Sequence, residues 1–161
     1  MIEIRKALKE DKPQVWEIIK TVISSGDTYV YKPDSPKEKM LDYWFGADKN
    51  TYVATIENTI VGTFYLKDNQ PDLGSHVANA GYMVAPEAKG KRVGSAMAEY
   101  SLLEAKRLGY KAMQFNFVVK SNEVAVKLWL NLGFQIIGEI PEAFKHAENG
   151  LTNAYIMYRK L

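Results

Sequence analysis

The segment from Val84 to Ser95, which reads VAPEAKGKRVGS, constrains this chain most because it joins a strand pattern to a helix pattern. The alternation of residues over 77–84 predicts a strand, and the apolar spacing over 94–108 predicts an amphipathic helix. Gly90 and Gly94 lie in the turn between them. Three cations are interleaved with these glycines: Lys89, Lys91 and Arg92. The chain must therefore hold at least one strand–turn–helix unit with a basic turn.

This turn predicts an anion site. A helix N-terminus presents free backbone N–H groups and the positive end of the helix dipole, which together favour a phosphate or pyrophosphate. The alternative is a solvated basic turn without a ligand, and the local residues leave both interpretations open. The turn is neither a G-x-x-x-x-G-K-[ST] loop nor a G-x-G-x-x-G loop, so the two best-known nucleotide motifs are absent.

Composition narrows the function classes. A length of 161 residues predicts one domain over 1–161. The net charge of +2 is too small to argue for nucleic acid, and the charge near Lys89 is local, which suits a small anion. The chain has no cysteine and only His76 and His146, which excludes thiolate chemistry and argues against a metal centre. We expect no membrane span, no secretory signal and a cytoplasmic location, because long apolar runs are missing.

Helix-period and strand-period segments alternate along the chain. The predicted strands cover 2–7, 52–56, 60–67, 77–84, 111–119, 134–140 and 153–159. The predicted helices begin at Asp11 with Gln14 as capping partner, at Ser35 with Glu38, at Gly94, and after the cap Asn122. The expected fold class is α/β, with a mixed sheet flanked by helices.

Two separated motifs carry a family resemblance. The first is K-G-K-R-V-G at 89–94, and the second is N-x-x-A-x-x-L-W-x-x-L-G-F from Asn122 to Phe134. Their order and spacing resemble the GNAT superfamily of acetyl-CoA-dependent N-acetyltransferases. The resemblance implies a central, mostly antiparallel twisted sheet that is splayed between strands 4 and 5 and flanked by about four helices. It covers nearly the whole chain.

The resemblance also implies a site for acetyl-CoA as cosubstrate, with no metal. Its pyrophosphate is expected on the basic turn, through Lys89, Gly90, Lys91, Arg92, Val93, Gly94 and Ser95. The pantetheine arm is expected to pair with the main chain of Met83 and Val84, as a strand adds to a sheet edge. Asn122 matches the family's helix-start asparagine, which commonly contacts the pantetheine. Its alternative role is that of a plain helix N-cap.

The catalytic groups depart from the family pattern. The resemblance assigns the oxyanion donor to the main-chain N–H near Val84. Trp129 stands where the family often has a tyrosine acid, and an indole N–H is no useful acid near neutral pH, so we interpret Trp129 as a core residue. The usual glutamate of the fourth strand is missing from HVANAGYMV. Tyr82 and Tyr155 are the proposed substitutes.

Arg92 is a further departure, because the family's loop often carries glycine there. If that position needs a positive φ, arginine costs about 1–2 kcal/mol. If it does not, arginine adds a phosphate partner. The residues alone leave both possibilities open.

On the acceptor side, the resemblance points to three segments: the loop with Asp27, Thr28 and Tyr29, the strand face with Asn116, and the last hairpin over 141–153. Asn116 interrupts an apolar run, so we expect a buried amide bonded either to substrate or to the backbone. The segments GDTY, FNFVVKSNEVAVKLW and LGF resemble the branch that contains fungal proline-analogue acetyltransferases. This resemblance implies a small, amino-acid-like amine as acceptor.

Two alternatives remain open. The acceptor could instead be a peptide or protein N-terminus, or the chain could be a non-catalytic acyl-CoA-binding module. For the acetyltransferase that the resemblance implies, the expected partner is a small amine. We expect no binding to nucleic acid or to a membrane. A homodimer is left open.

Overall fold

The computed structural model describes residues 1–161 and contains one seven-stranded sheet with four α-helices. The strands are β1 (Ile2–Lys6), β2 (Lys49–Ile56), β3 (Thr59–Asp68), β4 (Val77–Val84), β5 (Ala112–Val119), β6 (Gln135–His146) and β7 (Gly150–Lys160). The helices are α1 (Lys12–Ser24), α2 (Lys37–Trp44), α3 (Val93–Arg107) and α4 (Glu123–Asn131). The strand order across the sheet is β1-β2-β3-β4-β5-β7-β6.

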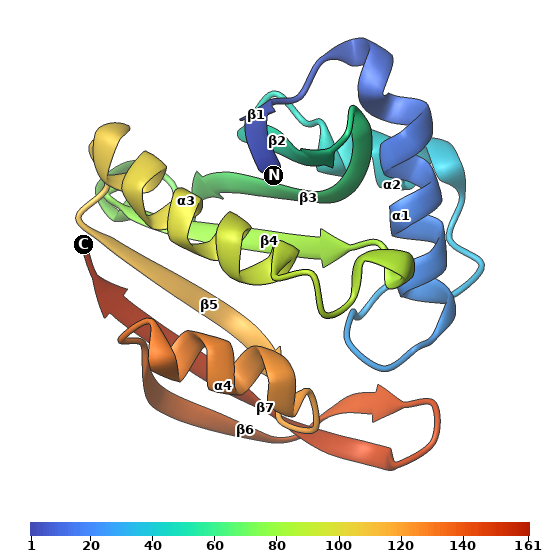
Figure 1. Cartoon of the computed structure of the whole chain (residues 1–161). Coiled ribbons are helices and arrows are strands. Elements are labelled where there is room, and N and C mark those ends of the chain that lie inside the picture. The colour runs from blue at the N-terminus through green and yellow to red at the C-terminus, as the bar shows by residue number, and fades with distance from the viewer.

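The sheet splits at its centre. β4 pairs antiparallel with β3 along its whole length, but it pairs parallel with β5 only at Val77–Ala112 and Ala78–Met113. Beyond those two pairs the strands diverge toward their C-terminal ends, as Figure 1 shows. The expected fold class and the splay between the fourth and fifth strands are both confirmed. The splay leaves one edge of β4 without a strand partner.

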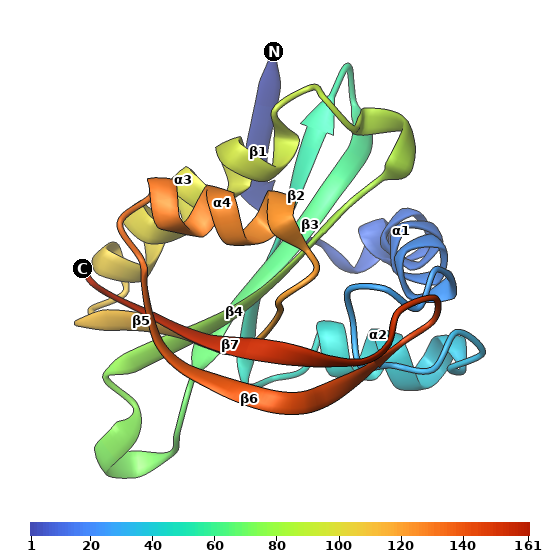
Figure 2. The ribbon, with the colours of Figure 1, turned by 90° about the horizontal axis from the view of Figure 1, so that it is seen from below.

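Helices cover both faces of the sheet. Figures 1 and 2 show α3 and α4 on one face and α1 and α2 on the other. Hydrogen bonds fasten both layers: Tyr82 on β4 bonds Ser101 on α3, and the Trp44 indole N–H on α2 donates to Thr63 on β3. No helix has the length and apolar character that crossing a membrane requires.

Two helix starts differ from the prediction. Asp11 does not cap α1 with its side chain. Its carboxylate instead accepts hydrogen bonds from the Arg5 guanidinium at 2.7 and 2.9 Å and from the Leu8 N–H at 2.7 Å. Gln14, the predicted capping partner, accepts a hydrogen bond from the Ile60 N–H. Partners outside α1 therefore replace the predicted cap.

The second helix begins later than predicted. The Ser35 hydroxyl donates to the Lys32 carbonyl at 2.7 Å, and Pro36 takes the N-cap position of α2 without a side-chain cap. Glu38 then lies in the first turn of α2, but there is no capping box. Ser35 belongs to the loop because its side chain closes a local turn there.

One of the two predicted hairpins agrees with the structure, and the other differs in length. The predicted hairpin across Asn58 is confirmed, with Glu57 and Asn58 at φ of 49° and 65°, values typical of a tight two-residue turn. The last hairpin is longer than predicted, because β6 runs to His146 and β7 starts at Gly150. The predicted acceptor loop over 141–153 is thus mostly strand. A register shift between Ile140 and Phe144 accommodates the proline there, and pairing then resumes.

Candidate active site

The basic turn forms an exposed, uncapped helix start. The Ala96 N–H donates to the Arg92 carbonyl at 3.0 Å, which is the first helical bond of α3. The N–H groups of Val93, Gly94 and Ser95 precede that bond, so the helix itself gives them no acceptor. No side chain caps this end, and Lys89, Lys91 and Arg92 are exposed around it. The turn therefore fits an anion.

The question of strain at Arg92 is answered by its backbone. Arg92 has φ 64° and ψ 18°, which is the left-handed region, and Gly90 has φ 78°. A side chain in that region costs about 1–2 kcal/mol. Arg92 thus occupies a position that glycine would take without strain, and it places a cation at the start of α3.

The unpaired edge of β4 exposes main-chain groups at alternate residues. The Ala85 N–H donates to the Val61 carbonyl, toward β3. Successive residues of a strand point their N–H groups to opposite edges, so the N–H groups of Val84 and Tyr82 point toward the splay. Met83 has the opposite orientation, and its main chain faces β3. Val84 is therefore placed to donate to a ligand along the open edge, whereas Met83 is not.

The Tyr29 side chain binds the open edge of β4 at Tyr82, the next residue after Val84 whose main chain faces the splay. Its hydroxyl donates to the Tyr82 carbonyl at 2.8 Å and accepts from the Tyr82 N–H at 2.8 Å. One side chain from the loop between α1 and α2 thus satisfies both main-chain groups of one β4 residue. A phenol is already protonated at neutral pH, and burial raises the pKa of Tyr29 further, so the hydroxyl is able to donate.

The Tyr82 side chain lies on the α3 face. Its hydroxyl bonds the Ser101 hydroxyl at 2.7 Å, and burial raises its pKa. A raised pKa makes a phenol a weaker acid, and its hydroxyl is already engaged. Trp129 is 6% exposed and packs between Tyr82 and Phe115, with ring centroids 4.9 and 4.4 Å away. Its position in the core agrees with the interpretation from sequence.

Tyr155 lies farther from the open edge of β4. It is on β7, opposite Val118 of β5, so β5 separates it from β4. It lines an open pocket of about 500 Å³ together with α4 residues, and the Lys120 amine is 5.6 Å from its ring centroid. The structure therefore does not bring Tyr155 together with Tyr82 and Val84.

Asn116 is exposed, so the prediction that its amide is buried is wrong. A register shift in β5 between Phe115 and Val118 turns this segment outward. The Asn116 side-chain N–H donates to the Asn69 side-chain oxygen at 2.7 Å, and its own oxygen accepts from Gln114 at 3.0 Å. The three amides form an uncharged, hydrogen-bonding row with no backbone partner. Asn69 was missed from sequence because it lies 47 residues from Asn116.

A tyrosine cluster extends from Tyr29. The rings of Tyr29 and Tyr31 stack at 6.2 Å, and Tyr31 packs on Tyr43 at 5.7 Å. The hydroxyls of Tyr43 and Tyr65 lie 3.2 Å apart, and Tyr65 packs against Gly81 of β4. The sequence pointed to the loop with Tyr29, but it missed Tyr43 and Tyr65, which come from a helix and a strand distant in sequence.

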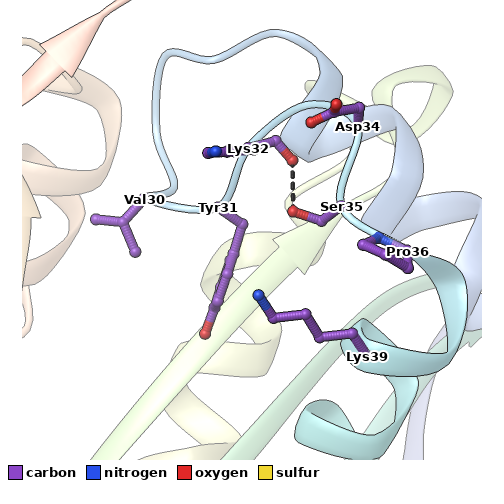
Figure 3. Close-up of a pocket in the computed structure, with 7 residues that line it drawn as sticks. All are labelled: Val30, Tyr31, Lys32, Asp34, Ser35, Pro36 and Lys39. Atoms are coloured by element: carbon purple, nitrogen blue, oxygen red, sulfur yellow. Dashed lines mark hydrogen bonds between the residues drawn. The ribbon is translucent and has the colours of Figure 1, made fainter.

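Tyr31 also lines an open pocket of about 450 Å³. Figure 3 shows the Lys39 amine pointing toward the Tyr31 ring, and the Ser35 hydroxyl closing the loop on the Lys32 carbonyl. The remaining lining residues are Val30, Asp34 and Pro36. The pocket thus carries two lysine amines and one carboxylate, next to the tyrosines that reach the β4 edge.

The loop between α1 and α2 touches the last hairpin. The Ala147 N–H donates to the Gly26 carbonyl at 3.1 Å, and Gly26 has φ 62°. A Cβ on Gly26 would lie 3.3 Å from the Ala147 Cβ. Asp27 and Thr28 follow directly, with the Asp27 carboxylate accepting from the Ser25 hydroxyl at 2.6 Å. The loop and the hairpin expected at the acceptor site do meet, although at the hairpin turn.

Asn122 caps α4. Its side-chain oxygen accepts from the Ala125 N–H at 3.4 Å, and its own N–H donates to the Val119 carbonyl. The plain capping role is therefore present. A contact with pantetheine stays a prediction.

Comparison with known proteins agrees with this geometry. The sequence profile of the acetyltransferase (GNAT) family matches residues 7–134. The N-acetyltransferase aca1 of Schizosaccharomyces pombe is 35% identical over 101 residues, which is 62% of this chain and 48% of that protein. This match therefore spans about half the length of the curated relative.

Solved structures share the whole fold. A GCN5-related N-acetyltransferase from Kribbella flavida is 38% identical, with a TM-score of 0.95 over 99% of this chain and 98% of that one. A phosphinothricin acetyltransferase from Sinorhizobium meliloti, solved with acetyl-CoA, is 20% identical, with a TM-score of 0.87 over 99% of this chain and 88% of that one. The latter likeness concerns the fold alone. On the family profile, the splayed sheet and the basic turn, this chain belongs to the GNAT acetyltransferase family.

Proposed function

We propose that this protein transfers the acetyl group of acetyl-CoA to the amine of a small, amino-acid-like molecule, by direct attack in a ternary complex. The observation that supports the proposal is that two groups of backbone N–H donors, one at the end of β4 and one at the start of α3, follow each other along the chain. The unpaired Val84 N–H ends β4, and the uncapped, basic start of α3 follows after the turn. The first set suits a thioester oxygen and the second suits a pyrophosphate.

Each part of this site has one task. Acetyl-CoA, when bound, supplies an activated thioester carbon. Lys89, Lys91 and Arg92 hold its phosphates together with the N–H groups of α3. The Val84 N–H stabilises the negative charge that develops on the carbonyl oxygen as the amine nitrogen bonds to the carbon. When the carbon–oxygen double bond re-forms, the carbon–sulfur bond breaks, and the thiolate of coenzyme A leaves and takes a proton through water.

Proton transfer is assigned to water and not to a tyrosine. The Tyr82 hydroxyl is bonded to Ser101, and Tyr155 lies beyond β5. The acceptor amine therefore enters neutral or loses its proton to water held by main-chain groups. On this proposal, kcat/KM rises with pH and levels off near the pKa of the acceptor amine.

The acceptor side favours a small polar molecule. The row of Asn69, Gln114 and Asn116 offers hydrogen bonds without charge, and the contact between Gly26 and Ala147 closes the loop on the hairpin. Lys32 and Lys39 suit the carboxylate of an amino-acid-like acceptor. A protein N-terminus would need a broader opening.

The test is acetyl-CoA consumption across a panel of free amino acids, cyclic imino acids, other small amines and short peptides. Turnover with the small molecules supports the proposal. Turnover with peptides only would replace it by a peptide acetyltransferase, and binding without turnover would leave an acyl-CoA-binding module.

A charge reversal tests the cofactor placement. Lys91→Glu is expected to weaken acetyl-CoA binding in calorimetry, and the loss should shrink at high salt because phosphate contacts are screened. Lys106→Glu, in the last turn of the same helix, is the matched control and should bind as wild type. Equal binding by both variants would refute the placement. The cytoplasmic location stays a prediction, and a homodimer stays open.

A further inference from the structure

The Tyr29 hydroxyl acts on the β4 edge as a missing strand partner would. It bonds both the carbonyl and the N–H of Tyr82, each at 2.8 Å, across 53 residues of sequence. The hydroxyl therefore supplies one acceptor and one donor at the point where β5 has diverged from β4. No other side chain in the protein bonds both main-chain groups of a residue on this edge.

This contact divides the edge. One step toward the N-terminus of β4, the Ala80 N–H donates to the Asn79 side-chain oxygen at 2.7 Å. At the centre, Tyr29 satisfies Tyr82. One step toward the basic turn, the Val84 N–H points toward the splay, since Ala85 points toward β3. The part of the edge open to a ligand is thus the Val84 end, next to the basic turn.

Tyr29 is held firmly in this position. Its ring stacks on Tyr31 at 6.2 Å and lies edge-on to Trp44 at 6.4 Å. Its protonated hydroxyl donates to the Tyr82 carbonyl and accepts from the Tyr82 N–H at once. An acyl chain that extended past Val84 would have to displace the hydroxyl, and because an alkyl chain has no hydrogen-bonding group it would leave the Tyr82 N–H and carbonyl without partners.

We propose that Tyr29 limits the length of the acyl group, so that the protein takes acetyl-CoA and rejects longer acyl-CoAs. The inference rests on the proposed function, because it requires the thioester to lie along the Val84 end of β4. Tyr29, which lies in the loop between α1 and α2, then determines the specificity for acyl length and takes no part in proton transfer.

The test compares acyl-CoAs of increasing length. Binding of acetyl-, propionyl- and butyryl-CoA is measured by calorimetry for wild type, Tyr29→Phe and Tyr29→Ala, and turnover is measured with an accepted amine. Wild type is expected to prefer acetyl-CoA over butyryl-CoA, which is two methylenes longer, by about tenfold or more, because even one added methylene in a closed pocket typically costs about tenfold. Tyr29→Ala should reduce that ratio to near one, and Tyr29→Phe should reduce it in part.

A matched control removes a hydroxyl elsewhere. Tyr52 is buried and donates to Glu104 at 2.8 Å, and this bond lies outside the splay. Tyr52→Phe should keep the wild-type ratio. If Tyr29→Ala does not fold, as judged by its melting transition, Tyr29→Phe alone decides the question.

The outcomes separate the two proposals. If wild type does not bind acetyl-CoA, the proposed function fails. If wild type binds acetyl-CoA and both Tyr29 variants keep the wild-type ratio of butyryl-CoA to acetyl-CoA, the length limit is refuted while the function stands. If the Tyr29 variants bind all three acyl-CoAs more tightly by the same factor, Tyr29 is a displaceable plug and the length limit is again refuted.

Discussion

Trp129 of α4 and Tyr82 of β4 pack ring against ring, with centroids 4.9 Å apart and planes inclined by 48°. The contact joins the two sides of the splay, because Trp129 also lies 4.4 Å from Phe115 of β5 and Tyr82 belongs to β4. Aromatic side chains thus maintain the packing where backbone pairing between β4 and β5 ends. We therefore expect Trp129 to support the site through the fold, as a core residue.

We expect Trp129→Phe to lower the free energy of unfolding by about 1–3 kcal/mol, because the smaller ring leaves part of the aromatic core unfilled. Turnover per folded molecule should stay close to wild type. Urea denaturation and an acetyl-transfer assay check this. Val124→Ala is the control, because Val124 is on the same helix and 83% exposed. A collapse of turnover with fold and acetyl-CoA affinity intact would give Trp129 a direct role.

Arg92→Gly is expected to change stability and binding in opposite directions. Removal of the strained side chain stabilises the fold, whereas the greater freedom of glycine in the unfolded chain destabilises it. The net gain in the free energy of unfolding should be up to about 1 kcal/mol. Loss of the cation should weaken acetyl-CoA binding and flatten its dependence on salt. Arg92→Asn separates the two effects, because asparagine tolerates a left-handed backbone but carries no charge. Unchanged affinity in both variants would make Arg92 a merely solvated residue.

Asn116→Ala should raise the KM for the acceptor, lower kcat, or both, while acetyl-CoA affinity stays nearly intact. The loss of one hydrogen bond to an uncharged partner costs about 0.5–1.5 kcal/mol, which is roughly a two- to tenfold change. Because Asn116 is exposed, its truncation should barely move the melting temperature. Asn131→Ala, at the end of α4, is the control for loss of an exposed amide. Unchanged acceptor kinetics would assign the acceptor to the Asp27–Tyr31 loop or to the C-terminal hairpin.

Asp11→Asn should destabilise the protein by about 1–2 kcal/mol at pH 7, because it removes the negative charge and one of the two oxygens that accept from Arg5, and the effect is limited because Arg5 is half exposed. The Arg5 guanidinium lowers the pKa of Asp11. The pKa of this carboxyl group is lower in the folded protein than in the unfolded chain, where it is about 4. The ion pair therefore stabilises the fold fully above about pH 4, and this stability is lost as the pH falls through the pKa of the folded state.

The difference between wild type and Asp11→Asn should therefore shrink as the pH falls below about 4, which urea denaturation at several pH values would measure. Glu10→Gln, an exposed neighbour in the same turn, is the control. A difference that does not vary with pH would mean that the ion pair contributes no pH-dependent stability.

Patterns that act within a few residues predicted the secondary structure well. The alternation over 77–84 predicted β4 with the observed bounds, and Asn122 caps α4 as expected, because strand faces and helix caps depend on neighbours up to four residues away. The same reasoning was wrong at Asp11 and Ser35. There, Arg5 and the Lys32 carbonyl offered better partners than the helix N-terminus did.

The sequence by itself determined the order of elements, the basic turn before α3 and the residue types that favour an anion there. Only the tertiary structure decided which edge of β4 stays open and which side chain occupies it. Tyr29 and Tyr82 are 53 residues apart, and Asn69 and Asn116 are 47 apart. Tyr29 meets Tyr82 because β5 diverges from β4 after two residue pairs, which leaves polar main-chain groups of β4 that find their partner in a distant loop. Asn69 meets Asn116 because the folded sheet brings the residue that follows β3 close to β5.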